Sequence, residues 1–155
     1  MPETIPAGRL QLSEVAKKQY GAMYQFSRSL DLDHGLRHLI EIRASQLNGC
    51  AFCLDMHWKD ARAAGESEER LSMVPVWDES PLFSDRERAA LALTEAMTLI
   101  SDNHVPDELW EDVSEHFDEQ ELAQVVFAIT IINAWNRLQI TTRVEPGHYQ
   151  PGMFG

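Results

Sequence analysis

The sequence has little positive charge, and this limits the partners that the protein could bind. Its 155 residues contain 13 lysines and arginines against 25 aspartates and glutamates, which gives a formal net charge of −12. The basic residues are scattered singly, so no basic patch offsets the acidic surface. We therefore expect neither nucleic acid nor an anionic membrane among its partners, because both attract basic surfaces.

Long hydrophobic runs and a secretory signal are also lacking. No segment approaches the roughly 18 consecutive apolar residues that indicate a membrane-spanning helix. The first residues, Met-Pro-Glu-Thr-Ile-Pro, contain neither a basic region nor an apolar run, so they do not resemble a signal peptide. These absences predict a cytoplasmic protein with no membrane partner.

Cysteine is scarce as well, since Cys50 and Cys53 are the only two in the chain. A disulfide between them would close too short a loop to constrain much of the unfolded chain, which excludes a role as a structural cross-link. In a reducing compartment, a pair with this spacing is usually catalytic or metal-binding. The two cysteines are therefore the first candidates for a functional site.

No stretch shows strand alternation with hairpin turns, and no internal repeat is present. Helical periodicity with short connections instead predicts an all-α fold of six or seven helices. The expected helices cover residues 13–30, 36–47, 50–64, 67–73, 84–100, 106–116 and 118–139. The length suits a single domain over residues 1–155, with residues 1–9 and 145–155 as loose arms.

The two cysteines and a histidine share one side of a predicted helix. At about 100° per residue, Cys50, Cys53 and His57 fall within an arc of roughly 60°. Asn48-Gly49 ends the preceding helix, so the pair stands at a helix N-terminus, where aligned amide dipoles increase the acidity of a cysteine. His57 follows Cys53 at i, i+4, close enough to exchange a proton with it. The opposite, solvated side of the helix carries Asp55, Lys59 and Arg62.

Three interpretations of this stretch remain open from the residues alone. Thiol redox chemistry would use both cysteines and the histidine. A zinc site would take Cys50, Cys53 and His57 as ligands, with His38 on the preceding helix as the fourth. The third interpretation is structural, with two small buried side chains and a core histidine. The redox interpretation is favoured, because zinc sites usually place C-x-x-C in a turn instead of a helix.

Residues 39–65, which contain C-A-F-C-L-D-M-H, closely resemble the core of the alkylhydroperoxidase AhpD-like branch of the carboxymuconolactone decarboxylase family. Residues 83–92 and 132–137 are similar to the same family, and the resemblance extends from about residue 10 to 145. It implies an AhpD-like helical fold with C-x-x-C at the N-terminus of a central helix. It also implies a homo-oligomer, typically a trimer or hexamer.

The resemblance further implies a thiol-dependent peroxidase or disulfide reductase that needs neither metal nor cofactor. Cys53 matches the peroxidatic cysteine that attacks a hydroperoxide, Cys50 its resolving partner, and His57 the relay histidine. A dithiol or lipoyl-type protein would be the reductant. Two rivals remain: a lactone decarboxylase, which does not rely on a cysteine pair, and a non-enzymatic redox-sensing or zinc-stabilised oligomer.

The chain departs from the family's pattern twice, and one departure is that Ala51 and Phe52 stand between the cysteines, where some members carry a histidine. Members usually carry a glutamate twelve residues before the first cysteine, and His38 stands there in this chain. We expect His38 to take part in the site, because a histidine has the right acidity for a proton relay. Glu41, about one turn on, is the alternative source of a carboxylate, although we expect it to belong to a solvated face.

Overall fold

The computed structural model describes residues 7–154, and these residues form helices and connecting segments without a β-strand. The α-helices are α1 (Leu12–Val15), α2 (Lys17–Ser29), α3 (His34–Asn48), α4 (Ala51–Ala63), α5 (Glu68–Met73), α6 (Asp85–Thr98), α7 (Ile100–Asn103), α8 (Asp107–His116) and α9 (Glu119–Thr142). A 3₁₀ helix, η1 (Val74–Glu79), lies in a stretch without a predicted helix. The all-α prediction is confirmed.

The described helices outnumber the six or seven expected, because two of them are single turns. The first predicted helix is divided at Ala16, whose backbone is not helical, and the four-residue α1 precedes that break. α7 is likewise a four-residue turn that follows a break at Leu99. Hydrophobic periodicity does not detect one-turn helices, so the number of long helices is close to the prediction.

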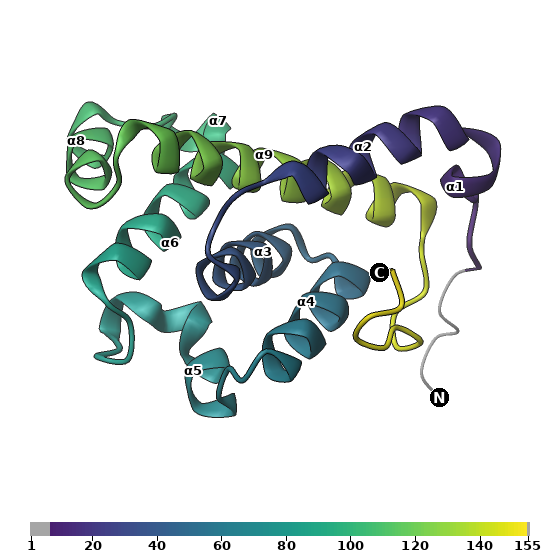
Figure 1. The fold of residues 1–155 in the computed structure, drawn as a ribbon, viewed down its shortest axis with the longest axis horizontal. Helices are drawn as coiled ribbons and strands as arrows, with labels where there is room; N and C mark the ends of the chain where they lie inside the picture. The colour runs from purple at the N-terminus through teal and green to yellow at the C-terminus, as the bar shows by residue number, and fades with distance from the viewer. Residues whose placement is uncertain (1–6, 155) are drawn as a thin grey trace.

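Helix α3 occupies the centre of the molecule, and α4, α6 and α9 pack around it (Figure 1). α9 runs along one side, with α2 beside its C-terminal half (Figure 1). The core between these helices includes Leu36, Ile40, Leu93, Val113, Ile129 and both cysteines. Burying each large apolar side chain contributes roughly 1.5–3 kcal/mol. The cysteine pair therefore belongs to the hydrophobic core and not to an exposed loop.

The turn between α3 and α4 determines where the cysteines lie. Asp33 caps the start of α3 by accepting a hydrogen bond from the backbone N–H of Leu36 at 2.9 Å. Gly49 ends the helix with a φ of 70°, a left-handed conformation that a residue without a Cβ adopts easily. The chain then enters α4 at once, with Cys50 as its N-cap. The predicted stop at Asn48-Gly49 is confirmed.

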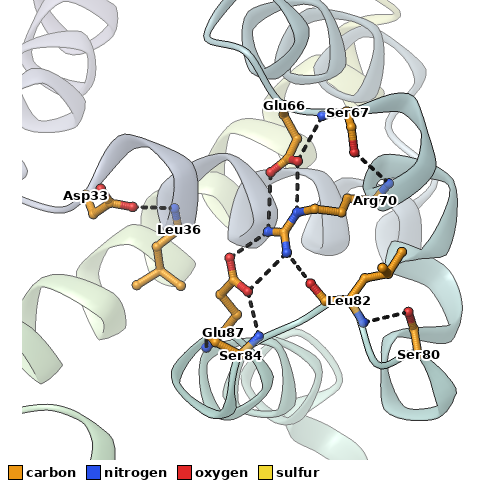
Figure 2. Close-up of polar contacts among 9 residues, drawn as sticks. All are labelled: Asp33, Leu36, Glu66, Ser67, Arg70, Ser80, Leu82, Ser84 and Glu87. Atoms are coloured by element: carbon orange, nitrogen blue, oxygen red, sulfur yellow. Dashed lines mark hydrogen bonds and ion pairs between the residues drawn. The ribbon is translucent and has the colours of Figure 1, made fainter.

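Arg70 joins α5 to the start of α6 (Figure 2). Its guanidinium donates to Glu66 Oε1 at 2.9 Å, to Glu87 Oε1 at 2.6 Å and to the carbonyl oxygen of Leu82. Glu87 also completes the capping box of α6 with Ser84 (Figure 2). One cation thus holds the connection between α5 and α6 in place.

The C-terminal segment was predicted to be a loose arm, and this prediction is wrong for residues 145–154. Tyr149 is only 5% exposed and donates from its hydroxyl to Asp60 Oδ1 at 2.7 Å. Lys59 Nζ donates to the Tyr149 carbonyl at 3.1 Å, and Asp55 Oδ2 accepts from the Gly147 N–H at 3.1 Å. A segment without periodicity is ordered here because its polar groups find partners on α4.

The N-terminal arm was predicted for residues 1–9, of which residues 1–6 lie outside the described part of the chain. Arg9 donates from its backbone N–H to the carbonyl of Thr142 at 3.0 Å, which ties residue 9 to the end of α9. Within residues 7–154, no helix is long and apolar enough to cross a membrane.

Candidate active site

The two cysteines lie at the N-terminus of α4, as predicted, and are almost completely buried. Cys50 is 2% exposed and Cys53 is 1% exposed, and both are free thiols. Cys50 Sγ accepts a hydrogen bond from the backbone N–H of Cys53 at 3.4 Å. The sulfur of Cys50 therefore caps the helix, where the amide dipoles stabilise a negative charge.

The acidities of the two thiols are shifted in opposite directions. A hydrogen bond from the Cys53 side chain lowers the pKa of Cys50 to about 7 although burial opposes it, and the Cys53 N–H, Asn136 and His57 add to the effect. The hydrogen bond with Cys50, followed by burial, raises the pKa of Cys53. In the reduced pair, the anion therefore resides on Cys50, while Cys53 retains a proton.

His57 lies one turn after Cys53 and pairs with Glu41 from α3. His57 Nδ1 is 3.0 Å from Glu41 Oε2, and Glu41 Oε1 accepts from Arg37 Nε at 2.8 Å. Burial raises the pKa of Glu41, but the charges and hydrogen bonds of His57 and Arg37 outweigh it and lower the pKa to about 2. The ionised carboxylate holds the proton of His57 on Nδ1, so Nε2 is the nitrogen left for proton exchange.

The prediction that Glu41 belongs to a solvated face is therefore wrong. The residue is only 6% exposed, because the side of α3 that carries it is covered by α4. A carboxylate in that position has the Arg37 guanidinium on one side and the His57 imidazole on the other, and such partners make its burial tolerable. The sequence showed Glu41 and His57 on two separate helices, and only the packing of α3 against α4 brings them together.

His38 lines the same cavity as Cys53 and His57, but the carboxylate that pairs with His57 is that of Glu41. Within residues 7–154 it makes no hydrogen bond to His57 or to either cysteine, and its ring lies 6.5 Å from that of His34. Burial, more than any nearby charge, lowers the pKa of His38, which favours the neutral imidazole. A role of His38 in proton transfer stays a prediction.

A cavity of about 740 Å³ opens beside the site. Its lining includes Cys53 but not Cys50, although both side chains are almost completely buried. Aromatic side chains from four parts of the chain form much of its wall: Tyr20 of α2, Phe52 of α4, Trp135 of α9, and Tyr149 and Phe154 of the C-terminal segment. The contributions of α2 and of this segment were not predicted, because they depend on tertiary packing.

A network of side-chain amides, in which Asn136 is buried and Asn48 and Asn133 are half-buried, links α9 to α3. Asn136 is completely buried and contacts Ser45 and Asn48 of α3 with its side chain. Sequence reasoning did not assign Asn136 to the site. The one available signal was an amide in the middle of an otherwise apolar helix.

The geometry does not favour the zinc interpretation. Among the described residues, no group of three or more histidine, cysteine, aspartate or glutamate side chains is arranged to hold a metal ion. His57 directs Nδ1 at Glu41, and His38 does not converge with the cysteines on a common point.

Comparison with known proteins gives consistent matches. The model of the "Carboxymuconolactone decarboxylase family" matches residues 16–96. The uncharacterized protein YdfG of Bacillus subtilis (strain 168) is 46% identical over 118 residues, which are 76% of this chain and 80% of YdfG.

Solved structures are similar along nearly the whole chain. A protein of unknown function from Agrobacterium tumefaciens, described as a candidate antioxidant defence protein AhpD, is 35% identical with a TM-score of 0.88, over 92% of this chain and 100% of its own. A peroxidase-related protein with an alkylhydroperoxidase AhpD core from Ralstonia eutropha JMP134 is 20% identical with a TM-score of 0.76, over 88% of this chain and 74% of its own. The second likeness concerns the fold alone.

Proposed function

The chain belongs to the carboxymuconolactone decarboxylase family and has an AhpD-like core, and from this premise we propose that it is a thiol-dependent peroxidase that reduces hydroperoxides through Cys50 and Cys53. One observation carries the proposal: Cys53 faces the cavity while its thiol is hydrogen-bonded to a partner cysteine with a pKa of about 7. The cavity gives a substrate access to Cys53, and the Cys50 thiolate is a base that can take the proton from Cys53.

In the first step, the Cys53 sulfur attacks the distal oxygen of a hydroperoxide. The Cys50 thiolate takes the proton from Cys53, and the oxygen–oxygen bond breaks. The leaving alkoxide receives a proton from the imidazolium of His57, whose charge Glu41 stabilises at 3.0 Å. The products are an alcohol and a sulfenic acid on Cys53.

In the second step, neutral His57 takes the proton from Cys50, and the new thiolate attacks the sulfur of the sulfenic acid. Hydroxide leaves and takes the proton back from His57, so one water is released as the Cys50–Cys53 disulfide forms. A dithiol or lipoyl-type reductant protein then supplies two electrons and two protons to restore the thiols. The working unit proposed is a homo-oligomer, a trimer or hexamer, as the family resemblance implies.

The test is consumption of an organic hydroperoxide with an excess of dithiol reductant. Wild type should turn over, whereas Cys53→Ser and Cys50→Ser should not. Under a slight excess of hydroperoxide without reductant, Cys50→Ser should accumulate sulfenic acid on Cys53, because the resolving thiol is missing.

Two outcomes would count against this assignment. Sulfenic acid found only on Cys50, in the Cys53→Ser variant, would reverse the order of attack. Oxidation of wild type to the disulfide without catalytic turnover would favour a redox sensor over an enzyme.

A further inference from the structure

Gln139 of α9 is a polar residue that is nearly buried and whose side chain has no partner. It is only 9% exposed, and it lines the cavity beside the cysteines. Its backbone carbonyl accepts from the N–H of Val144 at 3.1 Å, but within residues 7–154 its side-chain amide makes no hydrogen bond. A side-chain amide can donate two hydrogen bonds and accept two, and burying it without partners is unfavourable. The hydrogen-bonding capacity of this buried amide is therefore unused.

The unused amide borders the cavity. Among the described residues, every side-chain nitrogen or oxygen that is closed off from solvent has a hydrogen-bond partner. Because the amide of Gln139 has none, its nitrogen and its oxygen both border accessible space. Trp135, one turn earlier on the same side of α9, lines the cavity, and so does Ile132, two turns earlier. The amide thus stands at the end of an apolar stripe that α9 contributes to the cavity wall.

Two of the aromatic side chains in the wall have polar atoms, and these atoms are bonded within the protein. The Tyr149 hydroxyl donates to Asp60 Oδ1 at 2.7 Å, and the indole N–H of Trp135 donates to Ser27 Oγ at 2.8 Å. These two residues therefore offer ring surfaces to the cavity instead of hydrogen-bond donors. A wall that is mostly apolar, with a few well-placed polar groups, is typical of a site for a small organic molecule. Gln139 is one such polar group.

The charged side chains in the lining balance one another. Two arginines, Arg28 and Arg37, stand against two carboxylates, Glu41 and Asp60. Arg37 is already bonded to Glu41, with 2.8 Å between Nε and Oε1. Histidines also line the cavity, and burial lowers the pKa of His38, which favours its neutral form. The lining therefore has no excess of fixed charge to stabilise an ion, and it favours an uncharged ligand.

We propose that Gln139 binds the ligand of this cavity, an uncharged organic molecule whose apolar body lies against the aromatic rings and whose polar group bonds to the Gln139 amide. This inference rests on the proposed function for its catalytic meaning: the substrate reduced at Cys53 is then an uncharged organic hydroperoxide with a further polar group, such as an alcohol, ketone or amide. A cavity of about 740 Å³ lies within the range of small-molecule sites. Hydrogen peroxide would leave most of it unfilled.

The experiment measures the binding of benzyl alcohol, ethylbenzene and phenylacetate, which share a benzyl group and differ in a hydroxyl, a methyl or a carboxylate. Each is titrated into the reduced protein without hydroperoxide and followed by nuclear magnetic resonance. Wild type should bind phenylacetate about tenfold more weakly than benzyl alcohol, because the carboxylate loses its hydration without gaining a counter-charge. Gln139→Met keeps the length of the side chain and removes its amide. It should weaken benzyl alcohol about fivefold, through the loss of one neutral hydrogen bond, and change ethylbenzene by less than about twofold.

The matched control is Gln25→Met, the same substitution at an exposed position of α2 that does not line the cavity. It should leave the affinities for all three probes unchanged. Wild type supplies a test that does not depend on the folding of a variant. In a nitrogen-15-labelled sample, the side-chain N–H signals of Gln139 should move as benzyl alcohol is added and should saturate with its affinity, whereas those of Gln25 should stay in place.

Three results would overturn the proposal: no binding of benzyl alcohol to wild type, an equal loss for benzyl alcohol and ethylbenzene in Gln139→Met, or tighter binding of phenylacetate than of benzyl alcohol. The binding site and the peroxidase function can fail separately. The expected binding in a protein that consumes no hydroperoxide would support the site and refute the peroxidase. Turnover of a hydroperoxide by a protein whose Gln139 signals do not respond to benzyl alcohol would refute the site and leave the peroxidase standing.

Discussion

Glu41 shows how one buried carboxylate organises the site. It lies between His57 and Arg37 and is ionised in the folded protein. Replacing it by glutamine preserves the shape but leaves Arg37 and His57 without the carboxylate that they share. The free energy of unfolding at neutral pH should fall by about 2 kcal/mol, as measured by urea denaturation. Glu68→Gln is the control, since that residue forms an exposed ion pair with Arg62 and should change stability by less than about 0.5 kcal/mol.

Wild type and Glu41→Gln should also differ in how their stability depends on pH. The pKa of Glu41 falls from 4.5 to about 2 on folding, so its charge stabilises the folded state above pH 4.5. That contribution is lost as the pH falls from 4.5 towards 2. The difference in unfolding free energy between wild type and Glu41→Gln should therefore shrink over this range. A difference that stays constant there would show that Glu41 is not ionised by its neighbours.

The residues of the site differ in how far they could be predicted. Cys50, Cys53 and His57 lie within two turns of one helix, so helical geometry alone places them together. Glu41 pairs with His57 from α3, and Asn136 contacts α3 from α9, so both positions depend on how these helices pack. A glutamate or asparagine in a helix does not by itself indicate which residue of another helix it contacts, and the resemblance pointed to His38 first.

Among the structural elements, the turn between α3 and α4 restricts the choice of residue most strongly. Gly49 has a φ of +70°, while no atom stands within 4 Å of the place where a Cβ would be added. Gly49→Ala should therefore destabilise the protein by about 1 kcal/mol through backbone strain without a steric clash. Denaturation should give this value, and Gly21→Ala, inside α2 and equally open, is the control that should be neutral or stabilising.

Element boundaries followed local signals where those signals were strong. The capping boxes Ser84–Glu87 and Asp118–Glu121 begin α6 and α9 as predicted. The first helix was less predictable, since Ala16 interrupts it without a proline or glycine to mark the break.

At the scale of the whole molecule, residues 145–154 complete the wall of the cavity. Tyr149 and Phe154 line it, and the hydroxyl of Tyr24 donates to the Phe154 carbonyl. Deleting residues 145–155 should open the cavity and increase the alkylation rate of Cys53 several-fold for a bulky reagent. A small reagent, which needs less space, should gain less. Alkylation of Cys53 in the Cys50→Ser background measures this, with Tyr149→Phe as a variant that retains the ring and loses the hydroxyl that donates to Asp60.

The opposite outcome has a clear meaning. Equal rates for the bulky reagent in the full and the shortened chains would show that the segment does not restrict access to Cys53. Unfolding of the shortened chain, followed by circular dichroism, separates an opened cavity from a lost fold.

The fluorescence of Trp135 should report whether the cavity is occupied. Its indole lines the cavity, donates to Ser27 Oγ at 2.8 Å and meets the ring of Tyr20 edge-on at 5.1 Å. Trp110, by contrast, is 44% exposed on α8 and does not line the cavity. A molecule that occupies the cavity changes the surroundings of Trp135 and therefore its fluorescence emission. Binding can thus be followed without a label, in the Cys53→Ser protein, before any chemistry takes place.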